Sequence, residues 1–110
     1  MTIEIHTPHE GLQEAIVKQA KQAMIRLSNK FKSIARMECV WREDNLITPP
    51  DNKVCEIRAS AYGENLFTHA RADQYELATN EAMEHISQQV ILLASKENEL
   101  PDKITTTVKV

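Results

Sequence analysis

The sequence contains few of the residues that make tight turns or cross-links, with two glycines, four prolines and two cysteines in 110 residues. So little turn-forming material excludes a sandwich of many short strands and favours long regular elements. Cys39 and Cys55 are too few for a disulfide framework, and no cysteine or histidine cluster has the spacing of zinc ligands. We therefore expect both thiols to be reduced and to pack as small apolar side chains.

Long apolar segments are also missing. No run approaches the roughly 18 apolar residues that a transmembrane helix needs, and the N-terminus lacks the basic and then apolar order of a signal peptide. We expect a cytoplasmic protein with no membrane partner. Because a length of 110 residues suits one domain, we predict a single domain over residues 1–99 and a C-terminal tail over residues 100–110.

Signatures of catalysis and of cofactor binding are absent from the sequence as well. No serine, cysteine or threonine stands in a nucleophile motif, and Gly11 and Gly63 alone cannot build a phosphate-binding loop. The histidines have no ligand partners at metal spacing, which favours surface or half-buried imidazoles. They are His6, His9, His69 and His85. We predict a protein that is not an enzyme, with no catalytic residue, metal, cofactor or small-molecule substrate.

Apolar periodicity in the N-terminal half predicts a strand, a long helix and a second strand. Ile3 and Ile5 alternate with polar neighbours, which predicts a strand over residues 2–6. The capping box at residues 7–10, Thr-Pro-His-Glu, predicts a helix that begins there and ends at about Lys32. Its apolar stripe consists of Leu12, Ile16, Ala20, Ala23, Leu27 and Phe31. The apolar face of the second strand consists of Ala35, Met37, Cys39 and Trp41.

The next segment predicts a hairpin of two further strands. A double proline among turn-forming residues makes residues 43–53 a long connection. Alternation then predicts a strand over residues 54–62. A turn at residues 62–65 leads to a partner strand over residues 66–70.

A second helix is predicted after this hairpin. Asp73 is a suitable N-cap, and Glu76 follows three residues later. The apolar stripe continues to about Ser95, where we expect the helix to end. Pro101 is a predicted stop, and the tail from Leu100 is consistent with either a frayed end or an extra edge strand.

The predicted order is β-α-β-β-β-α, which indicates an α+β fold. We expect one four-stranded sheet with both helices packed on one face, because each strand has a single apolar side. The opposite face is then open to solvent, and its charges are mixed in sign, so cross-strand pairs are expected to neutralise one another. The residues on this face are Glu4, Arg36, Glu38, Glu56 and Arg58.

The charged residues are distributed unevenly along the chain. The formal net charge is −3, but residues 1–55 carry eight basic and seven acidic side chains, whereas residues 56–110 carry five and nine. On the first predicted helix, Lys18, Lys21 and Lys32 lie roughly opposite the apolar stripe. Arg26 and Lys30 flank that stripe. Such a helix can contact phosphates without reading bases, although ordinary solvated lysines explain the same pattern.

Several segments occur in an order that resembles one protein family. Residues 54–63 form the strand and turn, the segment Arg71-Ala72-Asp73-Gln74-Tyr75-Glu76-Leu77-Ala78 opens the second helix, and Ile86-Ser87-Gln88-Gln89-Val90 follows within it. With the β-α-β-β-β-α order, they resemble the bacterial ribosome hibernation-promoting factors, also called ribosome-associated inhibitor A or sigma-54 modulation proteins. The resemblance spans nearly the whole chain and corresponds to the short form, which lacks the C-terminal dimerisation domain of the long forms.

This resemblance implies a stress-response protein that binds the small ribosomal subunit and its rRNA where messenger and transfer RNA would pass. Members of the family make this contact with basic residues on both helices, but the second helix here has Glu84-His85 and Ser87-Gln88 in that region. The RNA-binding residues implied for this chain are Lys18, Lys21, Arg26, Lys30, Lys32, Arg36 and Arg71. Fewer phosphate contacts predict binding that is weaker than typical for the family and steeply dependent on salt.

Two functions from different classes follow. The first is a non-enzymatic translation inhibitor that occupies the small-subunit RNA channel through its basic residues. The second is a divergent member of the same fold that acts as a protein–protein interaction module and has lost RNA binding. Leu77, Ile91 and Leu92 accompany acidic residues on the outer side of the second helix, which suits a protein partner or a homodimer.

Overall fold

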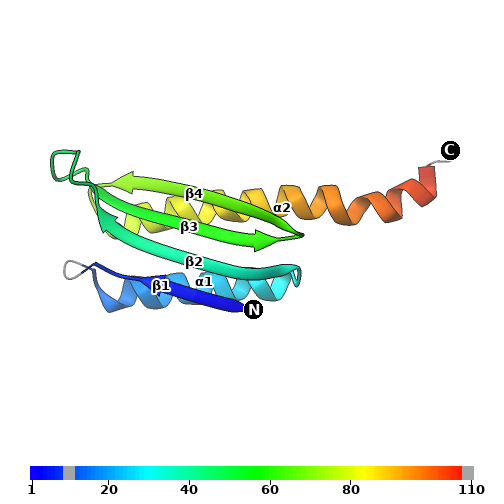
Figure 1. The fold of residues 1–110 in the computed structure, drawn as a ribbon, viewed down its shortest axis with the longest axis horizontal. Coiled ribbons are helices and arrows are strands. Elements are labelled where there is room, and N and C mark those ends of the chain that lie inside the picture. Colours follow the sequence, from blue (N-terminus) through cyan, green and yellow to red (C-terminus); the bar gives the residue numbers. More distant parts are fainter. Residues whose placement is uncertain (9–11, 108–110) are drawn as a thin grey trace.

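The alternating and helical patterns of the sequence produce the predicted order of elements in the computed structural model (Figure 1). The structure describes residues 1–8 and 12–107, and side chains as far as Lys96. The elements are β1 (Thr2–His6), α1 (Glu14–Lys30), β2 (Ile34–Glu43), β3 (Lys53–Ala61), β4 (Glu64–Ala72) and α2 (Tyr75–Thr107). Among the described residues, neither helix combines the length and the hydropathy of a membrane-spanning segment.

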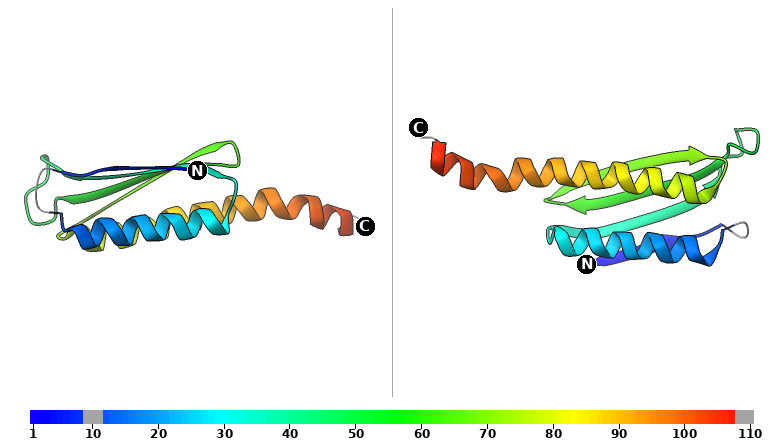
Figure 2. Two further views of the ribbon diagram at one scale, coloured as in Figure 1. Left: turned by 90° about the horizontal axis from the view of Figure 1, so that it is seen from below. Right: turned by 180° about the vertical axis from the view of Figure 1, so that it is seen from behind.

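The four strands form one mixed sheet in the order β1-β2-β3-β4. β1 pairs with β2 in parallel, while the other two pairs are antiparallel hairpin neighbours. A parallel pair needs a crossover connection, which α1 supplies. Both helices cover the same face of the sheet and leave the other face open (Figure 2). The predicted α+β architecture is therefore confirmed.

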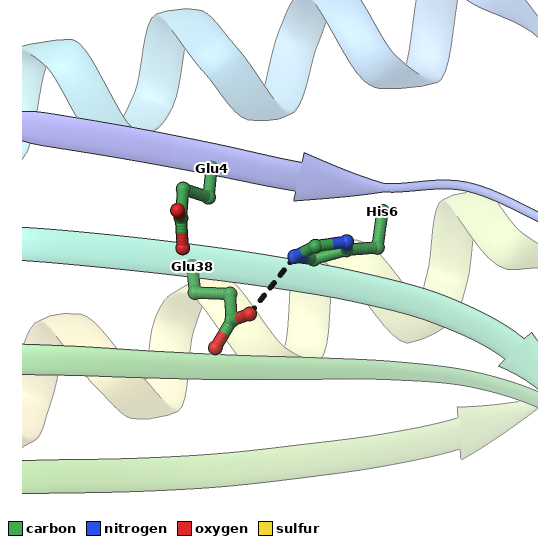
Figure 3. Close-up of side chains that lie close together, drawn as sticks. All are labelled: Glu4, His6 and Glu38. Atoms are coloured by element: carbon green, nitrogen blue, oxygen red, sulfur yellow. Dashed lines mark ion pairs between the residues drawn. The ribbon is translucent and has the colours of Figure 1, made fainter.

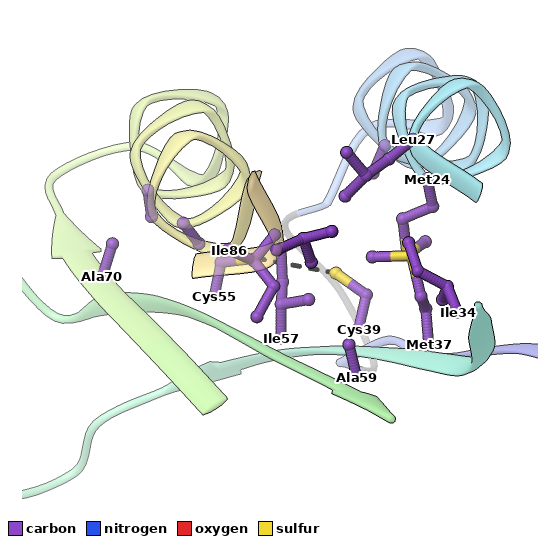
Figure 4. Packing of buried hydrophobic residues seen from close by; sticks show 14 of the residues in the cluster. Met24, Leu27, Ile34, Met37, Cys39, Cys55, Ile57, Ala59, Ala70 and Ile86 are labelled. Atoms are coloured by element: carbon purple, nitrogen blue, oxygen red, sulfur yellow. Dashed lines mark hydrogen bonds between the residues drawn. The ribbon is translucent and has the colours of Figure 1, made fainter. Parts of the chain in front are cut away.

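The hydrophobic core lies between the sheet and the two helices (Figure 4). β2 and β3 contribute the apolar faces that alternation predicted, including the buried residues Cys39, Trp41 and Ile57. A polar link crosses this core, because the Trp41 indole Nε1 donates to Thr79 Oγ1 at 2.8 Å. The Thr79 hydroxyl in turn donates to the Tyr75 carbonyl oxygen at 2.6 Å. This pair of bonds ties the centre of the sheet to α2.

The first helix begins later than the capping box predicts. α1 starts at Glu14 with Gln13 as its N-cap, and no side chain caps it. Because β1 and β2 are parallel, the chain must reverse direction and move from the sheet layer to the helix layer after His6. That connection uses the residues assigned to the first helical turns, of which residues 9–11 lie outside the described part. The helix also ends slightly early, at Lys30, with Phe31 as its C-cap.

A local irregularity at the start of β2 corrects the predicted face of that strand. Ala35 is exposed, whereas Ile34 is buried in the core. The register shifts between Ile34 and Arg36, as a β-bulge does. An extra residue in one strand reverses the side to which its neighbours point, so simple alternation fails at this position.

The β3–β4 hairpin is longer and tighter than its predicted form. β4 runs from Glu64 to Ala72, and the turn consists of Tyr62 and Gly63. Both turn residues have positive φ angles, of 54° and 76°. This is the geometry of a type I′ turn, whose twist matches that of the flanking strands.

The second helix also differs from its predicted length. α2 begins at Tyr75 and continues to Thr107, so the predicted end near Ser95 and the predicted stop at Pro101 are wrong. A proline removes one backbone hydrogen bond but has a φ angle that a helix accepts, so it need not end one. The tail forms no edge strand within the described residues, and α2 extends well beyond the sheet (Figure 1). The division between a domain ending at residue 99 and a separate tail stays a prediction.

Candidate nucleic-acid interface

The exposed side of α1 carries four cationic side chains, and a fifth follows in the next turn. The core side of this helix is fixed by Ala20, Met24 and Leu27, which are buried against the sheet and α2. Residues at the other helical positions therefore point outward. The five exposed cations are Lys18, Lys21, Arg26, Lys30 and Lys32. We refer to these five residues as the α1 cation group.

None of the α1 cation group forms an ion pair with a carboxylate among the residues whose side chains are described. Lys30 has an aromatic neighbour instead, with its Nζ 5.6 Å from the centroid of the Phe31 ring. Unpaired ammonium and guanidinium groups at the surface keep their full attraction for a polyanion, because no neighbouring carboxylate competes for them. The helix therefore presents positive charge that is available to phosphates.

The α1 cation group spans two surfaces of the helix. Lys18 and Lys21 line a concave surface with residues of α1 alone. Arg26 and Lys30 instead line a groove of about 310 Å³ between the two helices, which Glu84 of α2 also lines. A phosphate backbone that follows α1 would therefore meet one acidic side chain on each surface, Glu14 beside Lys18 and Lys21 and Glu84 beside Arg26 and Lys30.

The outer side of α2 is acidic, as the sequence predicts. Glu76, Glu81 and Glu84 are all exposed. Three large apolar side chains are exposed on the same helix, and they are Leu77, Ile91 and Leu92. Carboxylates repel phosphate, so α2 disfavours the binding of an anionic partner along most of its described length.

Arg36 and Arg71, the remaining residues of the implied RNA contact set, lie apart from the α1 cation group. Arg36 stands on β2, where its guanidinium donates to the Glu4 carboxylate. Arg71 is exposed on β4, next to Val54 in the register. β4 alternates between residues that face the helices, such as Ala70, and residues that face solvent, so Arg71 belongs to the open face. The seven residues therefore do not form one contiguous surface.

The open face of the sheet is a network of ion pairs, which confirms the predicted neutralisation. Glu38 lies at its centre, 2.9 Å from His6 Nε2 and 3.7 Å from Arg58 Nη1. Arg36 pairs with Glu4. Arg42 also pairs with Glu56 on this face, at 3.1 Å and toward the other end of the sheet. Lys53 pairs with Glu43 at 2.6 Å on the side that the helices cover, where Lys53 Nζ is 5.8 Å from the centroid of the Tyr75 ring.

One part of this network has the composition of a metal site. Glu4, His6 and Glu38 point toward one another from β1 and β2, with one donor atom of each within 4.8 Å of the others (Figure 3). However, Arg36 and Arg58 already pair with these two carboxylates. A divalent cation would have to displace or tolerate two guanidinium groups, so the cluster suits internal charge balance better than metal binding.

The two thiols lie in the core, on the apolar faces of neighbouring strands, as predicted. Cys39 Sγ and Cys55 Sγ are 3.6 Å apart and fully buried (Figure 4). The hydrogen bond with Cys55, followed by burial, raises the pKa of the Cys39 thiol far above its ordinary range. Because the thiolate is the nucleophilic form, the raised pKa disfavours nucleophilic chemistry at Cys39 in the folded protein at neutral pH.

One exposed aromatic side chain lies outside the set of residues that the sequence pattern singled out. Phe67 is 46% exposed on β4 and faces solvent on the open side of the sheet. The signal was present, because Phe67, His69 and Arg71 occupy alternate positions of the strand, opposite in phase to the buried Thr68 and Ala70. A large aromatic residue at a solvent-facing position of a strand indicates a candidate binding residue.

Two solved structures share this fold. A ribosomal subunit interface protein from Coxiella burnetii superposes with a TM-score of 0.70 at 13% identity, over 86% of this chain and 99% of that chain. The N-terminal domain of Protein Y from Thermus thermophilus superposes with a TM-score of 0.64 at 15% identity, over 82% and 96%. No protein-family model and no curated protein sequence matches the chain. At the level of the fold, these likenesses confirm the predicted resemblance to the hibernation-promoting factors.

Proposed function

We propose that this protein is a non-enzymatic, cytoplasmic ribosome-binding factor of the hibernation-promoting type. In this proposal it occupies the RNA channel of the small subunit and inhibits translation by excluding messenger and transfer RNA. The observation that carries the proposal is the α1 cation group, whose five members have no carboxylate partner among the described side chains. The shared fold with a ribosomal subunit interface protein supports the choice of partner.

The physical basis of the interaction is the release of counterions from RNA. Each ammonium or guanidinium group that contacts a phosphate displaces a condensed cation, which favours binding at low salt and requires no base recognition. Five such contacts from one helix are a moderate number, and Glu76, Glu81 and Glu84 on α2 add none. We therefore expect an affinity that is lower than that of a protein with two basic helices, with a steep dependence on salt.

Co-sedimentation with purified ribosomes tests this proposal. The protein is incubated with 30S subunits, 50S subunits and 70S ribosomes at about 50 mM and about 200 mM salt, a range over which phosphate contacts weaken strongly. We expect pelleting with 30S and 70S particles at the lower salt and its loss at the higher. Competition by messenger and transfer RNA would place the site in the channel. Absence of pelleting with any particle at the lower salt would refute the proposal.

A second candidate function is favoured by the exposed apolar side chains of α2. Leu77, Ile91 and Leu92 are 51%, 46% and 70% exposed beside acidic residues. In this alternative the chain is a protein–protein interaction module or a homodimer in which RNA binding is lost. Light scattering coupled to size-exclusion chromatography separates the two functions. A dimer that does not bind ribosomes supports the alternative, and a monomer that does bind them excludes it.

A further inference from the structure

A pocket on the open face of the sheet has a composition unlike that of the rest of this face. It has a volume of about 450 Å³ and lies over β2, β3 and β4 near the β3–β4 turn. Two guanidinium groups line it and no carboxylate does. The polar and aromatic residues of its lining are Arg36, Arg58, Ser60, Asn65 and Phe67.

The aromatic part of this pocket is a cation–π pair. Arg58 and Phe67 are cross-strand neighbours, and the Arg58 guanidinium carbon lies 5.4 Å from the centroid of the Phe67 ring. The His69 ring follows on the same strand, with its centroid 5.9 Å from that of Phe67. The Arg58 side chain is 59% exposed, so a further planar group has access to the Arg58–Phe67 pair.

The polar part of the pocket retains hydrogen-bond donors. Arg58 Nη1 is 3.7 Å from the Glu38 carboxylate, which is longer than a hydrogen bond, so this guanidinium is only loosely held. Ser60 donates its hydroxyl to Asn65 Oδ1 at 3.1 Å. This bond orients the Asn65 amide and leaves its NH₂ group, which is a donor. The Arg36 guanidinium is bonded to the Glu4 carboxylate, so the loosely held Arg58 guanidinium and the Asn65 amide are the donors that suit an anionic ligand.

We propose that this pocket binds a nucleotide unit, with its base against the exposed Arg58–Phe67 pair and its phosphate against the Arg58 guanidinium. A planar π system adjoining an arginine is the arrangement by which proteins hold single-stranded nucleic acid, because stacking is strong and tolerant of sequence. The unit is either a free nucleotide or part of a single RNA strand. This site goes beyond the proposed function, since it lies on the face of the sheet opposite to α1 (Figure 2).

Binding of two probes by the whole protein tests this inference. A fluorescein-labelled, single-stranded RNA octamer is titrated by anisotropy, and adenosine monophosphate is titrated by calorimetry. Phe67→Leu keeps an apolar side chain but removes the ring, while Phe67→Tyr keeps the ring. We expect Phe67→Leu to weaken octamer binding about tenfold, the range of a lost base–aromatic stack, and Phe67→Tyr to bind as the parent does. Leu92→Ala, an exposed apolar residue on α2, is the matched control.

The outcomes show whether the ligand is an RNA strand or a free nucleotide, and which results contradict the inference. Octamer binding without monophosphate binding supports the inference with an RNA strand as ligand, and binding of both supports it with free nucleotide as a ligand as well. Equal octamer affinity of Phe67→Leu and the parent, or no binding of either probe, overturns it. Circular dichroism verifies that each variant is folded. Ribosome pelleting of Phe67→Leu distinguishes this site from the α1 surface, because the proposed function predicts that pelleting is retained.

Discussion

Both faces of the molecule carry basic side chains, but these side chains have different neighbours on the two faces. On the open face of the sheet, Arg36, Arg42 and Arg58 each pair with a carboxylate of a neighbouring strand. On the exposed side of α1, the five cations have no such partner among the described side chains. The number of basic residues on a surface is therefore a poor guide to its affinity for phosphate. What matters is whether the same fold brings carboxylates within reach of them.

The reason for the difference lies in the geometry of the two elements. Neighbouring strands place side chains about 5 Å apart in register, so opposite charges on one face of a sheet meet directly. A helix surface brings together only residues three or four positions apart. α1 has a single acidic residue, Glu14, four positions before Lys18, and no ion pair forms there.

The largest expected effect comes from removing the charge of α1. We predict that the combined change Lys18→Gln, Lys21→Gln, Arg26→Gln and Lys30→Gln lowers ribosome affinity on the order of 100-fold at low salt. The logarithmic salt dependence should become shallower by about three to four, because each of the four lost phosphate contacts removes roughly 0.7 to 0.9 units of slope. Pelleting titrations at several salt concentrations measure both quantities.

A variant with a change on the other face is the control for that prediction. Arg42→Gln removes one cation of the open face, outside the nucleotide pocket, and this cation is already paired with Glu56. We expect ribosome affinity to change less than about twofold, since surface pairs of this kind contribute little. If this variant were to lose as much affinity per charge as the α1 variant does, the contrast between the two faces would be wrong.

The next prediction concerns the buried core, where a substitution changes the stability of the fold but leaves the surface charges unchanged. Thr79→Val leaves the buried Trp41 indole N–H without its acceptor. We predict a loss of about 1–3 kcal/mol in the free energy of unfolding, the cost of an unsatisfied buried donor. Urea denaturation measures this loss. Thr79→Ser retains the hydroxyl and should lose clearly less, and folded Thr79→Val should still pellet with ribosomes.

A smaller effect is expected from the buried thiol pair as pH rises. The folded state raises the pKa of Cys39 above its ordinary value of 9.0. The unfolded chain therefore releases this proton first, so the contribution to stability is complete below about pH 9 and is lost above it. We predict a decline of up to about 1.4 kcal/mol per pH unit.

Urea denaturation between pH 8 and 10 tests this prediction, with Cys39→Ala as the comparison. The alanine variant is expected to have a flatter profile over this range. Tyr75 also has a raised pKa, caused mainly by burial, but its ordinary value of 10.0 places its effect at the upper end of the range. Identical slopes in the parent and the variant between pH 8.5 and 9.5 would contradict the assignment to Cys39.

The smallest expected effect comes from creating an unpaired cation on the open face of the sheet. Glu4→Gln removes the partner of Arg36 and leaves that guanidinium unpaired on the open face. We predict a two- to threefold increase in the affinity for a generic RNA duplex, with a salt slope that is steeper by nearly one. Gel-shift titrations at two salt concentrations measure it, and an unchanged affinity would show that pairing does not limit this face.

The strands and the core were more predictable than the ends of the helices. Alternation identified β1 residue for residue and the buried faces of β2 and β3 apart from the bulge at Ala35. The starting point of α1 was wrong, because a capping box is a local signal while the parallel pairing of β1 and β2 is not. The end of α2 was also wrong, because Pro101 was treated as a stop.

The candidate site was predictable only in part. The exposure of Lys18, Lys21, Arg26, Lys30 and Lys32 followed from the helical stripe. The placement of Arg36 and Arg71 on the opposite face depends on how strands and helices are layered, which a count of charges ignores. The pocket beside Phe67 combines residues of β2, β3 and β4, so no single segment contains it.

Hydrophobic periodicity and local charge thus settled the order of the elements, the buried side of each strand and the basic character of α1, because these properties arise between residues close in the chain. Which cations remain unpaired and which residues line the pocket on the sheet were settled only by strand pairing and layer packing. Those properties arise between residues far apart in the chain, such as Arg36 with Glu4 and Trp41 with Thr79, whose contact requires the whole fold.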